Sequence, residues 1–123
     1  MISVSELKPG IYRMSFDRKM KLSFQNSRQF RDSLNQVAAK NLTGLILNCG
    51  NLEFIDSSAI SVLVSFIKQV STRGIWLKIC EANTDTKLIF DMIRLEKLAE
   101  ILATEHDIME QLQVAAISEA VPK

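Results

Sequence analysis

The sequence predicts an α/β domain built on a small parallel or mixed β-sheet. Predicted strands alternate with predicted helices along the chain, which is the order typical of such sheets. The largely apolar run at residues 45–49 indicates a central parallel strand that is buried on both faces. The length of 123 residues fits one domain, and 47% hydrophobic with 24% charged residues is an ordinary globular composition.

Short extended segments are expected before the first helix. Residues 2–7 indicate a short strand or an arm, and Pro9-Gly10 is a typical turn pair. Residues 11–16 predict a strand, since apolar side chains at every second position share one face. Residues 20–22 indicate a brief extended segment after a charged turn.

Residues 23–41 predict the first helix. Asn26, followed three positions later by Gln29, resembles a capping box at the start of that helix. Apolar residues then recur at helical spacing: Phe30, Leu34, Val37 and Ala38. Thr43-Gly44 breaks this pattern before the central strand.

Residues 57–72 predict the second helix, and Gly74 follows it at the position where glycine is favoured. Its apolar residues cover roughly 200° of the helix surface, whereas a surface helix needs a stripe of only about 100°. The helix is therefore either buried between neighbours or presents apolar surface to a partner. The opposite face is polar: Ser57, Ser61, Ser65, Lys68 and Thr72.

The C-terminal third is expected to hold a strand, a third helix, a short last strand and a fourth helix. Residues 75–80 alternate like a strand that has one face more buried than the other. Asn83-Thr84-Asp85 is expected to cap the third helix, whose predicted apolar face is Leu88, Ile89, Met92, Ile93 and Leu95. Residues 100–103 indicate the last strand, residues 104–107 form a capping box, and residues 118–123 are expected to be a frayed tail.

The composition argues against several classes of protein. The formal net charge of +1 shows no basic excess that would indicate a nucleic-acid partner. The N-terminus lacks the basic and apolar regions of a signal peptide, and no apolar run reaches the roughly 18 residues of a membrane span. We therefore expect a cytoplasmic protein with no direct membrane insertion.

The residues that could carry catalysis or bind a metal are few. Cys49 and Cys80 are expected to be buried, reduced thiols, because no metal-ligand spacing accompanies them. The single histidine, His106, lies in a capping segment far along the chain from any serine that it could activate. The sequence thus offers no catalytic constellation and no metal site, and the protein is not expected to be an enzyme.

The stretch Asp56-Ser57-Ser58 lies between the central strand and the second helix. Asp or Ser directly before an apolar-periodic segment is a helix-start signal. The outward amide N–H groups and the dipole of a helix start favour an anion such as phosphate. The same pattern is that of an ordinary helix cap. The two interpretations, an anion site and a helix cap, are compatible if Asp56 caps the helix while Ser57 is exposed.

Residues 54–60, Phe-Ile-Asp-Ser-Ser-Ala-Ile, resemble the signature of STAS domains, the anti-sigma factor antagonist family. Residues 89–101 are similar to the closing helix and strand of that family. The resemblance implies one STAS domain over residues 1–123, with a core at about residues 11–117 and about four helices mainly on one side of the sheet. In signalling members the serine or threonine directly after the aspartate is phosphorylated. The matching residue is Ser57, with Ser58 as second choice.

The resemblance also implies a function and partners. The protein would be a non-catalytic partner-switching regulator without a cofactor, and phosphorylation would turn off its binding to a serine kinase or anti-sigma-like protein. A PP2C-type phosphatase would reverse the modification. Besides Ser57, the residues expected to contact the partner are Asp56, Ser58, Ala59, Ile60, Ser61 and Ser65. The sequence leaves open which process is controlled: sigma-factor activity, secretion or biofilm formation.

Two other functions remain open. The chain is also compatible with a constitutive STAS subunit of an ABC-type membrane transport complex that is never phosphorylated, because a fold does not decide function. A third function is a small-ligand module that binds an anion at the same helix start.

Three departures from the family pattern distinguish this sequence. Ala59-Ile60-Ser61 stands where the family usually has Gly-Leu-Gly, and the bulkier side chains change the fit of a partner. Ser23 stands where many members carry an acidic residue before the first helix. Arg94 replaces the glycine that usually ends the third helix. These changes indicate a divergent member.

Overall fold

The structure is a computed structural model that describes the backbone of residues 1–120 and the side chains of residues 1–113. Five strands form the main sheet in the order β1-β2-β4-β6-β7. Their bounds are Ile2–Lys8 for β1, Ile11–Phe16 for β2, Gly44–Asn48 for β4, Trp76–Cys80 for β6 and Glu100–Ile101 for β7. β1 runs antiparallel to β2 and the other pairs are parallel, so the N-terminal segment is an edge strand and not an arm.

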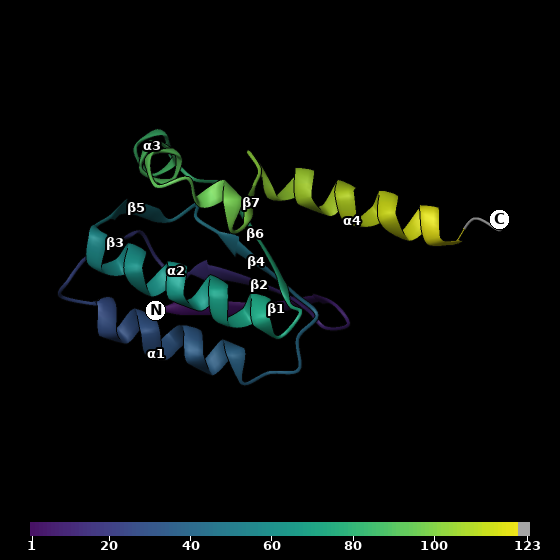
Figure 1. Ribbon diagram of the computed structural model, residues 1–123, viewed down its shortest axis with the longest axis horizontal. Helices are drawn as coiled ribbons and strands as arrows, with labels where there is room; N and C mark the ends of the chain where they lie inside the picture. Colours follow the sequence, from purple (N-terminus) through teal and green to yellow (C-terminus); the bar gives the residue numbers. More distant parts are fainter. Residues whose placement is uncertain (121–123) are drawn as a thin grey trace.

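The helices are α1 (Ser27–Ala38), α2 (Ser57–Thr72), α3 (Thr84–Met92) and α4 (Glu105–Ala120), with a 3-10 helix η1 (Leu95–Lys97). α1 and α2 run side by side, and α4 lies apart from them (Figure 1). Buried residues of α1, α2 and α3 share one large core with the sheet, whereas α4 contributes Ile108 to a smaller cluster with Ile46 and Cys80. The predicted α/β fold, with its helices mainly on one side, is confirmed.

β4 is buried on both faces, as its apolar sequence predicts. Leu45 and Leu47 belong to the large core, and Ile46 belongs to the smaller cluster with Ile108 of α4. This double burial is typical of a central strand in a parallel sheet. It also positions the start of α2, because the chain leaves β4 at Asn48 and reaches Ser57 after one turn and one short strand.

That short strand, β5 (Leu52–Ile55), pairs in parallel with β3 (Met20–Leu22) in a separate ladder. The sequence did not indicate β5, because its two buried ends enclose two exposed residues and strict alternation is absent. The extended segment expected at residues 20–22 is confirmed as β3. The ladder continues into the site, since the backbone N–H of Asp56 donates to the carbonyl of Leu22 at 3.0 Å.

The first helix is shorter than predicted at both ends. α1 begins at Ser27 and not at Ser23, and the predicted capping box at Asn26 is wrong. The Asn26 Oδ1 atom instead accepts from the backbone N–H of Ser23 at 2.8 Å, and its Nδ2 atom donates to the carbonyl of Lys21 at 2.9 Å. The side chain therefore closes the turn between β3 and α1, which competes with capping.

The predicted apolar face of the third helix is also mostly wrong. α3 packs through Thr86 and Phe90, which are fully buried, whereas Leu88 is 56% exposed and Met92 is 83% exposed. Leu95, in η1, is buried as predicted, and half-buried Ile89 packs against the large core as predicted. The cause is the contact between α3 and β5, an element that the sequence did not indicate. Two large apolar side chains of α3, Leu88 and Met92, are thus left on the surface.

The expected caps of α3 and α4 are confirmed. Asn83 Oδ1 accepts from the backbone N–H of Thr86 at 2.8 Å. Thr104 and Asp107 form the reciprocal capping box, with N–H to side-chain oxygen distances of 3.1 and 3.3 Å. The last strand spans two residues of the predicted four. Residues 118–120 of the predicted frayed tail continue α4, and residues 121–123 lie outside the described residues.

Gly44→Ala is expected to destabilise the fold by about 1–3 kcal/mol. Gly44 pairs with Trp76 across β4 and β6, and a Cβ atom at Gly44 would lie 2.1 Å from the indole Cε2 atom. The indole would have to move, so the fluorescence of this single tryptophan should change together with the unfolding midpoint. Gly74→Ala, which meets only backbone strain at φ 75°, should lower stability without changing the emission. Unchanged emission in Gly44→Ala would contradict this packing.

Candidate functional site

Asp56 organises the start of α2. It adopts an extended backbone (φ −100°, ψ 178°), and its Oδ1 atom accepts from the backbone N–H of Ala59 at 3.0 Å. Its Oδ2 atom accepts from the backbone N–H of Phe24 at 2.9 Å. One carboxylate therefore caps α2 and also ties the turn between β3 and α1 to that helix. The Ser57 hydroxyl takes no part in the cap.

Ser57 is the first residue of α2, and its side chain is exposed to solvent. Its carbonyl oxygen accepts from the hydroxyl of Ser61 at 3.0 Å. Among the hydrogen bonds of the described residues, none uses the Ser57 hydroxyl. An exposed hydroxyl at the amino end of a long helix lies where free amide groups and the dipole favour negative charge.

The structure brings most of the predicted contact residues to one edge. Ser61 and Ser65 are exposed one and two turns along α2, and Asp56, Ser58 and Ile60 are half-buried. Ala59 is fully buried in the core, because the Asp56 cap turns this position inward, so its side chain is not available to a partner. The candidate surface therefore leaves out Ala59.

Phe24 belongs to the same edge, although no pattern in the sequence predicted this. Its side chain is 78% exposed, and its backbone is bonded to Asp56. The helix was predicted to begin at residue 23, so the turn before α1, which exposes the Phe24 side chain, was not expected. Ser23 lies beside Phe24 in this turn, so the position where the family often has an acidic residue does adjoin the site.

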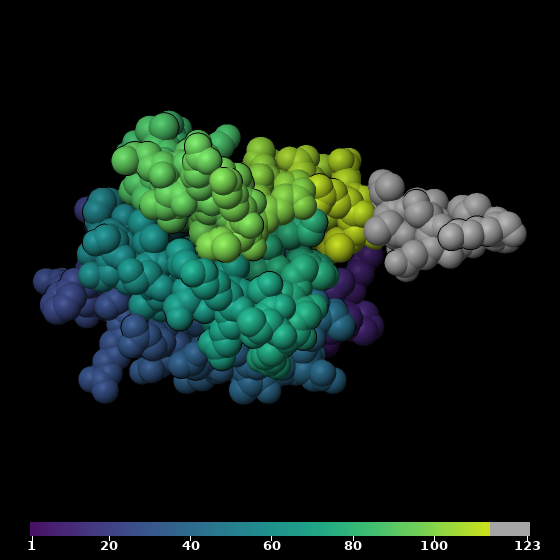
Figure 2. Space-filling view, viewed as in Figure 1, coloured from purple at the N-terminus to yellow at the C-terminus, as the bar shows by residue number. Residues whose placement is uncertain are grey.

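A groove of about 430 Å³ runs between α2 and the η1 region. It is lined by Ile60, Ser61, Val64, Ser65, Lys68, Ile93, Leu95 and Leu98. Figure 2 shows the green surface near η1 directly beside the teal surface of α2. Most of the wide apolar arc of α2 is buried between neighbours, while half-buried Ile60 and Val64 open into the groove. Burial between neighbours thus accounts for most of the arc, and contact of the remaining apolar surface with a partner stays a prediction.

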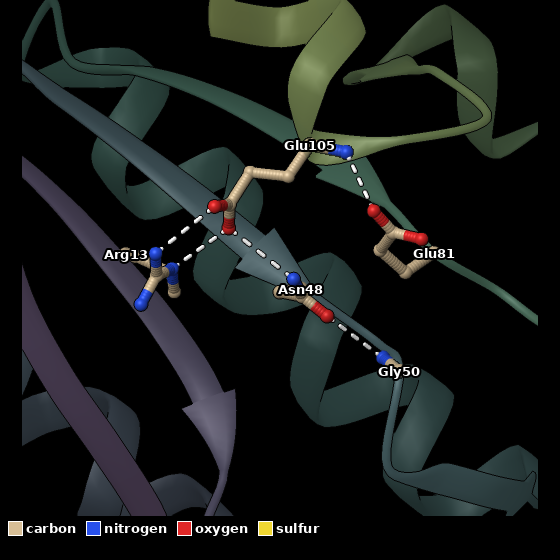
Figure 3. A network of polar contacts seen from close by, with 5 residues as sticks. All are labelled: Arg13, Asn48, Gly50, Glu81 and Glu105. Atoms are coloured by element: carbon tan, nitrogen blue, oxygen red, sulfur yellow. Dashed lines mark hydrogen bonds and ion pairs between the residues drawn. The ribbon is translucent and has the colours of Figure 1, made fainter.

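A polar network fixes the start of α4 to the carboxyl end of β4 (Figure 3). Arg13 donates to both carboxylate oxygens of Glu105 at 2.7 and 3.0 Å, and Asn48 Nδ2 donates to Oε1 at 3.2 Å. Asn48 Oδ1 also accepts from the backbone N–H of Gly50 at 2.9 Å. The carboxylate of Glu81, a residue with left-handed backbone (φ 61°), accepts from the N–H of Glu105 at 2.7 Å.

This network controls the charge of Glu105. Its partial burial by itself raises the pKa, but the hydrogen bonds from Arg13 and Asn48 outweigh burial and hold the pKa of Glu105 below its ordinary value. No local sequence pattern could predict the network, because Arg13 and Glu105 are separated by 92 positions.

The other titratable candidates lie away from this edge. His106 is exposed and pairs with Glu110 one helical turn later at 3.1 Å. Cys49 and Cys80 are free, buried thiols as predicted, and burial raises the pKa of both. The described part of the chain contains no group of three His, Cys, Asp or Glu residues that could hold a metal. It also contains no helix with the length and apolarity needed to cross a membrane.

A small α/β domain with this strand order, in which an aspartate-capped helix begins with an exposed serine, has the architecture of a STAS domain. The family model described as STAS domain matches residues 5–108, and the chain belongs to that family. A curated relative, an anti-sigma F factor antagonist of Paenibacillus polymyxa, is 28% identical over 72 residues. That match covers 58% of this chain and only 62% of the relative.

Solved structures show the same fold. An anti-sigma factor antagonist from Mycobacterium paratuberculosis superposes with a TM-score of 0.79 at 13% identity, covering 92% of this chain and 93% of the other. SpoIIAA, a Bacillus cell fate determinant in its phosphorylated form, gives 0.64 at 15% identity, with 91% and 99% covered. The murine anion transporter Slc26a9 gives 0.71 at 15% identity, with 85% of this chain but only 18% of the transporter covered.

Proposed function

We propose that the protein is a non-catalytic partner-switching regulator whose binding to a kinase or anti-sigma-type protein is turned off by phosphorylation of Ser57. The observation that carries this proposal is the exposed hydroxyl of Ser57 at the start of α2, which forms no hydrogen bond within the described residues. The curated relative named as an anti-sigma factor antagonist supports the class of partner. The phosphorylated SpoIIAA structure supports the modification.

The site can hold a phosphate without a change of fold. A phosphoserine adds a charge of about −1.5 to −2 and three acceptor oxygens. At a helix start the dipole and amides are worth roughly 0.3–1 kcal/mol to an anion, so the modified protein stays folded. The modification changes the surface and not the conformation. A partner that covers this surface would then meet a charge for which it has no counterpart.

The proposed contact edge consists of the residues around the start of α2 that reach the surface. These are Phe24, Asp56, Ser57, Ser58, Ile60, Ser61 and Ser65. Ser58 is the second candidate for phosphorylation, but its half-buried side chain makes it less accessible than Ser57. We assign removal of the phosphate to a PP2C-type phosphatase, in a cytoplasmic setting that also contains the kinase.

A second candidate function is a constitutive subunit of an ABC-type membrane transport complex. The likeness to a domain of an anion transporter favours it, because the same fold is found there in a transport protein. This alternative predicts no phosphorylation in the cell. Phosphate-affinity gels of the protein from growing cells distinguish the two functions, since a slower band that phosphatase removes excludes the constitutive subunit.

Ser57→Ala is expected to abolish phosphorylation by the proposed partner serine kinase, and Ser58→Ala is expected to leave it intact. Ser57 is exposed and is the first residue of α2, whereas Ser58 is half-buried. The measurement is phosphosite mapping by mass spectrometry after incubation with kinase and ATP. Ser58→Ala is the matched control, because it removes the adjacent hydroxyl. Modification that persists in Ser57→Ala would contradict the assignment.

A further inference from the structure

The groove between α2 and η1 has a largely apolar lining that is open to solvent. Half-buried Ile60 and Val64 form one wall, and Ile93 and Leu98, both more than 40% exposed, form the other. Large apolar side chains gathered on one surface typically mark a site for a partner. The groove begins at Ile60 and Ser61, and the Ser61 hydroxyl donates to the carbonyl of Ser57, so the groove starts one helical turn from Ser57.

Among the residues that line the groove or adjoin its lining residues in sequence, positive charges outnumber negative ones. Lys68 is the single charged residue between Ser57 and Thr72, and it lines the groove. Arg94 and Lys97 flank the opposite wall with one acidic residue, Glu96. In the described part of the chain, no ion pair involves Lys68, Arg94 or Lys97. These cations are therefore available to an acidic partner.

Arg94 is held in a strained backbone conformation. Its φ of 57° and ψ of 46° lie in the left-handed region, which costs a residue with a Cβ atom about 1–2 kcal/mol. Glycine would avoid most of this cost. No side-chain hydrogen bond of Arg94 is found among the described residues to offset it. Strain of this kind is typical of functional sites. This strain is accounted for if the Arg94 guanidinium contacts a partner molecule.

We propose that the groove binds one amphipathic α-helix of the kinase-type partner, with apolar residues on Ile60 and Val64 and acidic residues facing Lys68 and Arg94. The identity of the partner rests on the proposed function, whereas the apolar lining and the positive charges of the groove are independent of it. Binding of an amphipathic helix in an apolar groove is a common recognition mode. An acidic helix would also be repelled by a phosphate on Ser57, which gives the switch a direct electrostatic cause.

The test uses two synthetic helical peptides of about 14 residues, long enough to form a helix when bound. Both peptides carry leucine at positions i, i+3, i+4 and i+7. The remaining positions are rich in glutamate in the first peptide and in lysine in the second. Fluorescence anisotropy should show that the wild-type protein binds the glutamate peptide at least about tenfold more tightly. Added salt should reduce this difference.

Variants of the groove sharpen the test. Lys68→Glu should invert the preference between the two peptides, and Val64→Ser should weaken binding of both. Lys40→Glu is the matched charge control, because Lys40 lies over Tyr12 at the end of α1 and does not line the groove. Thermal unfolding of each variant confirms that it is folded.

Arg94→Gly separates a binding role from a structural one. It should raise the unfolding midpoint, because it removes the backbone strain, and yet lower the affinity for the glutamate peptide about fivefold or more. Stabilisation without loss of affinity would overturn the role of Arg94. Equal affinity for the two peptides, or no binding by either at about 1 mM, would overturn the groove proposal. The groove proposal would also be overturned if the wild-type protein formed a dimer that Val64→Ser dissociates.

The two proposals fail in different ways. If the peptides are discriminated but Ser57→Ala and Ser57→Asp bind the partner equally, the groove stands and the phosphorylation switch fails. If neither peptide binds, but Ser57→Asp loses the partner and Ser57→Ala retains it, the switch stands and the groove proposal fails.

Discussion

Ser57→Asp is expected to weaken binding of the partner kinase by about two to three orders of magnitude. In the free protein the new carboxylate lies in solvent at the positive end of α2, so the fold tolerates it. A partner that covers this edge must remove water from the charge without offering an opposite one. We expect that to cost about 3–4 kcal/mol. Ser57→Ala adds no charge and should bind like the wild type.

Ser71→Asp is the matched control for this prediction. Ser71 is an exposed serine near the other end of the same helix, outside the proposed contact edge. The substitution adds the same charge and should leave the affinity unchanged, although it lowers stability slightly through the helix dipole. Titration calorimetry of the three variants with the kinase measures the effect. Equal affinities of Ser57→Ala and Ser57→Asp would refute the electrostatic switch.

Arg13→Met is expected to lower the free energy of unfolding by about 2–3 kcal/mol at neutral pH. The substitution leaves the Glu105 carboxylate, whose side chain is only 20% exposed, without its bidentate partner. The loss should be smaller than the 3–5 kcal/mol typical of fully buried pairs, because solvent reaches both side chains and screens the charges. Arg18→Met, at an exposed arginine outside the network, should change stability little.

The pH dependence gives this prediction a second readout. The folded-state pKa of Glu105 is lowered, so its stabilising contribution is present above the ordinary pKa of 4.5 and is lost as the pH falls below that value. The wild type should therefore lose stability on acidification more steeply than Arg13→Met. Glu105→Gln should flatten the curve in the same way, and the double variant should show non-additive losses. Parallel curves for wild type and Arg13→Met would contradict the role of this pair.

Local patterns in the sequence were sufficient for the fold and for the start of α2. The apolar run of β4 and the aspartate before an apolar helix are signals carried by a few adjacent residues. The first predicts a strand buried on both faces, and the second predicts a capped helix start. The cap at Asp56 and the exposure of Ser57 are therefore found where the sequence places them.

Features that depend on distant contacts were out of reach of the sequence. Phe90, and not Leu88 or Met92, is buried in α3, because β5 decides which side of the helix faces inward. The groove and its strained Arg94 likewise follow from how α2 and η1 meet, which no local pattern encodes. The error at Asn26 is a local one, because an asparagine side chain can close a turn as well as cap a helix, and this one bonds to the carbonyl of Lys21 five residues earlier.

The most direct test of the central claim is a calorimetric titration of the partner kinase with unmodified protein and with protein phosphorylated only at Ser57. We expect tight binding of the unmodified protein, a loss of about two orders of magnitude or more after phosphorylation, and full recovery after phosphatase treatment. Circular dichroism of the two forms should be the same. Binding that phosphorylation leaves unchanged would contradict the account.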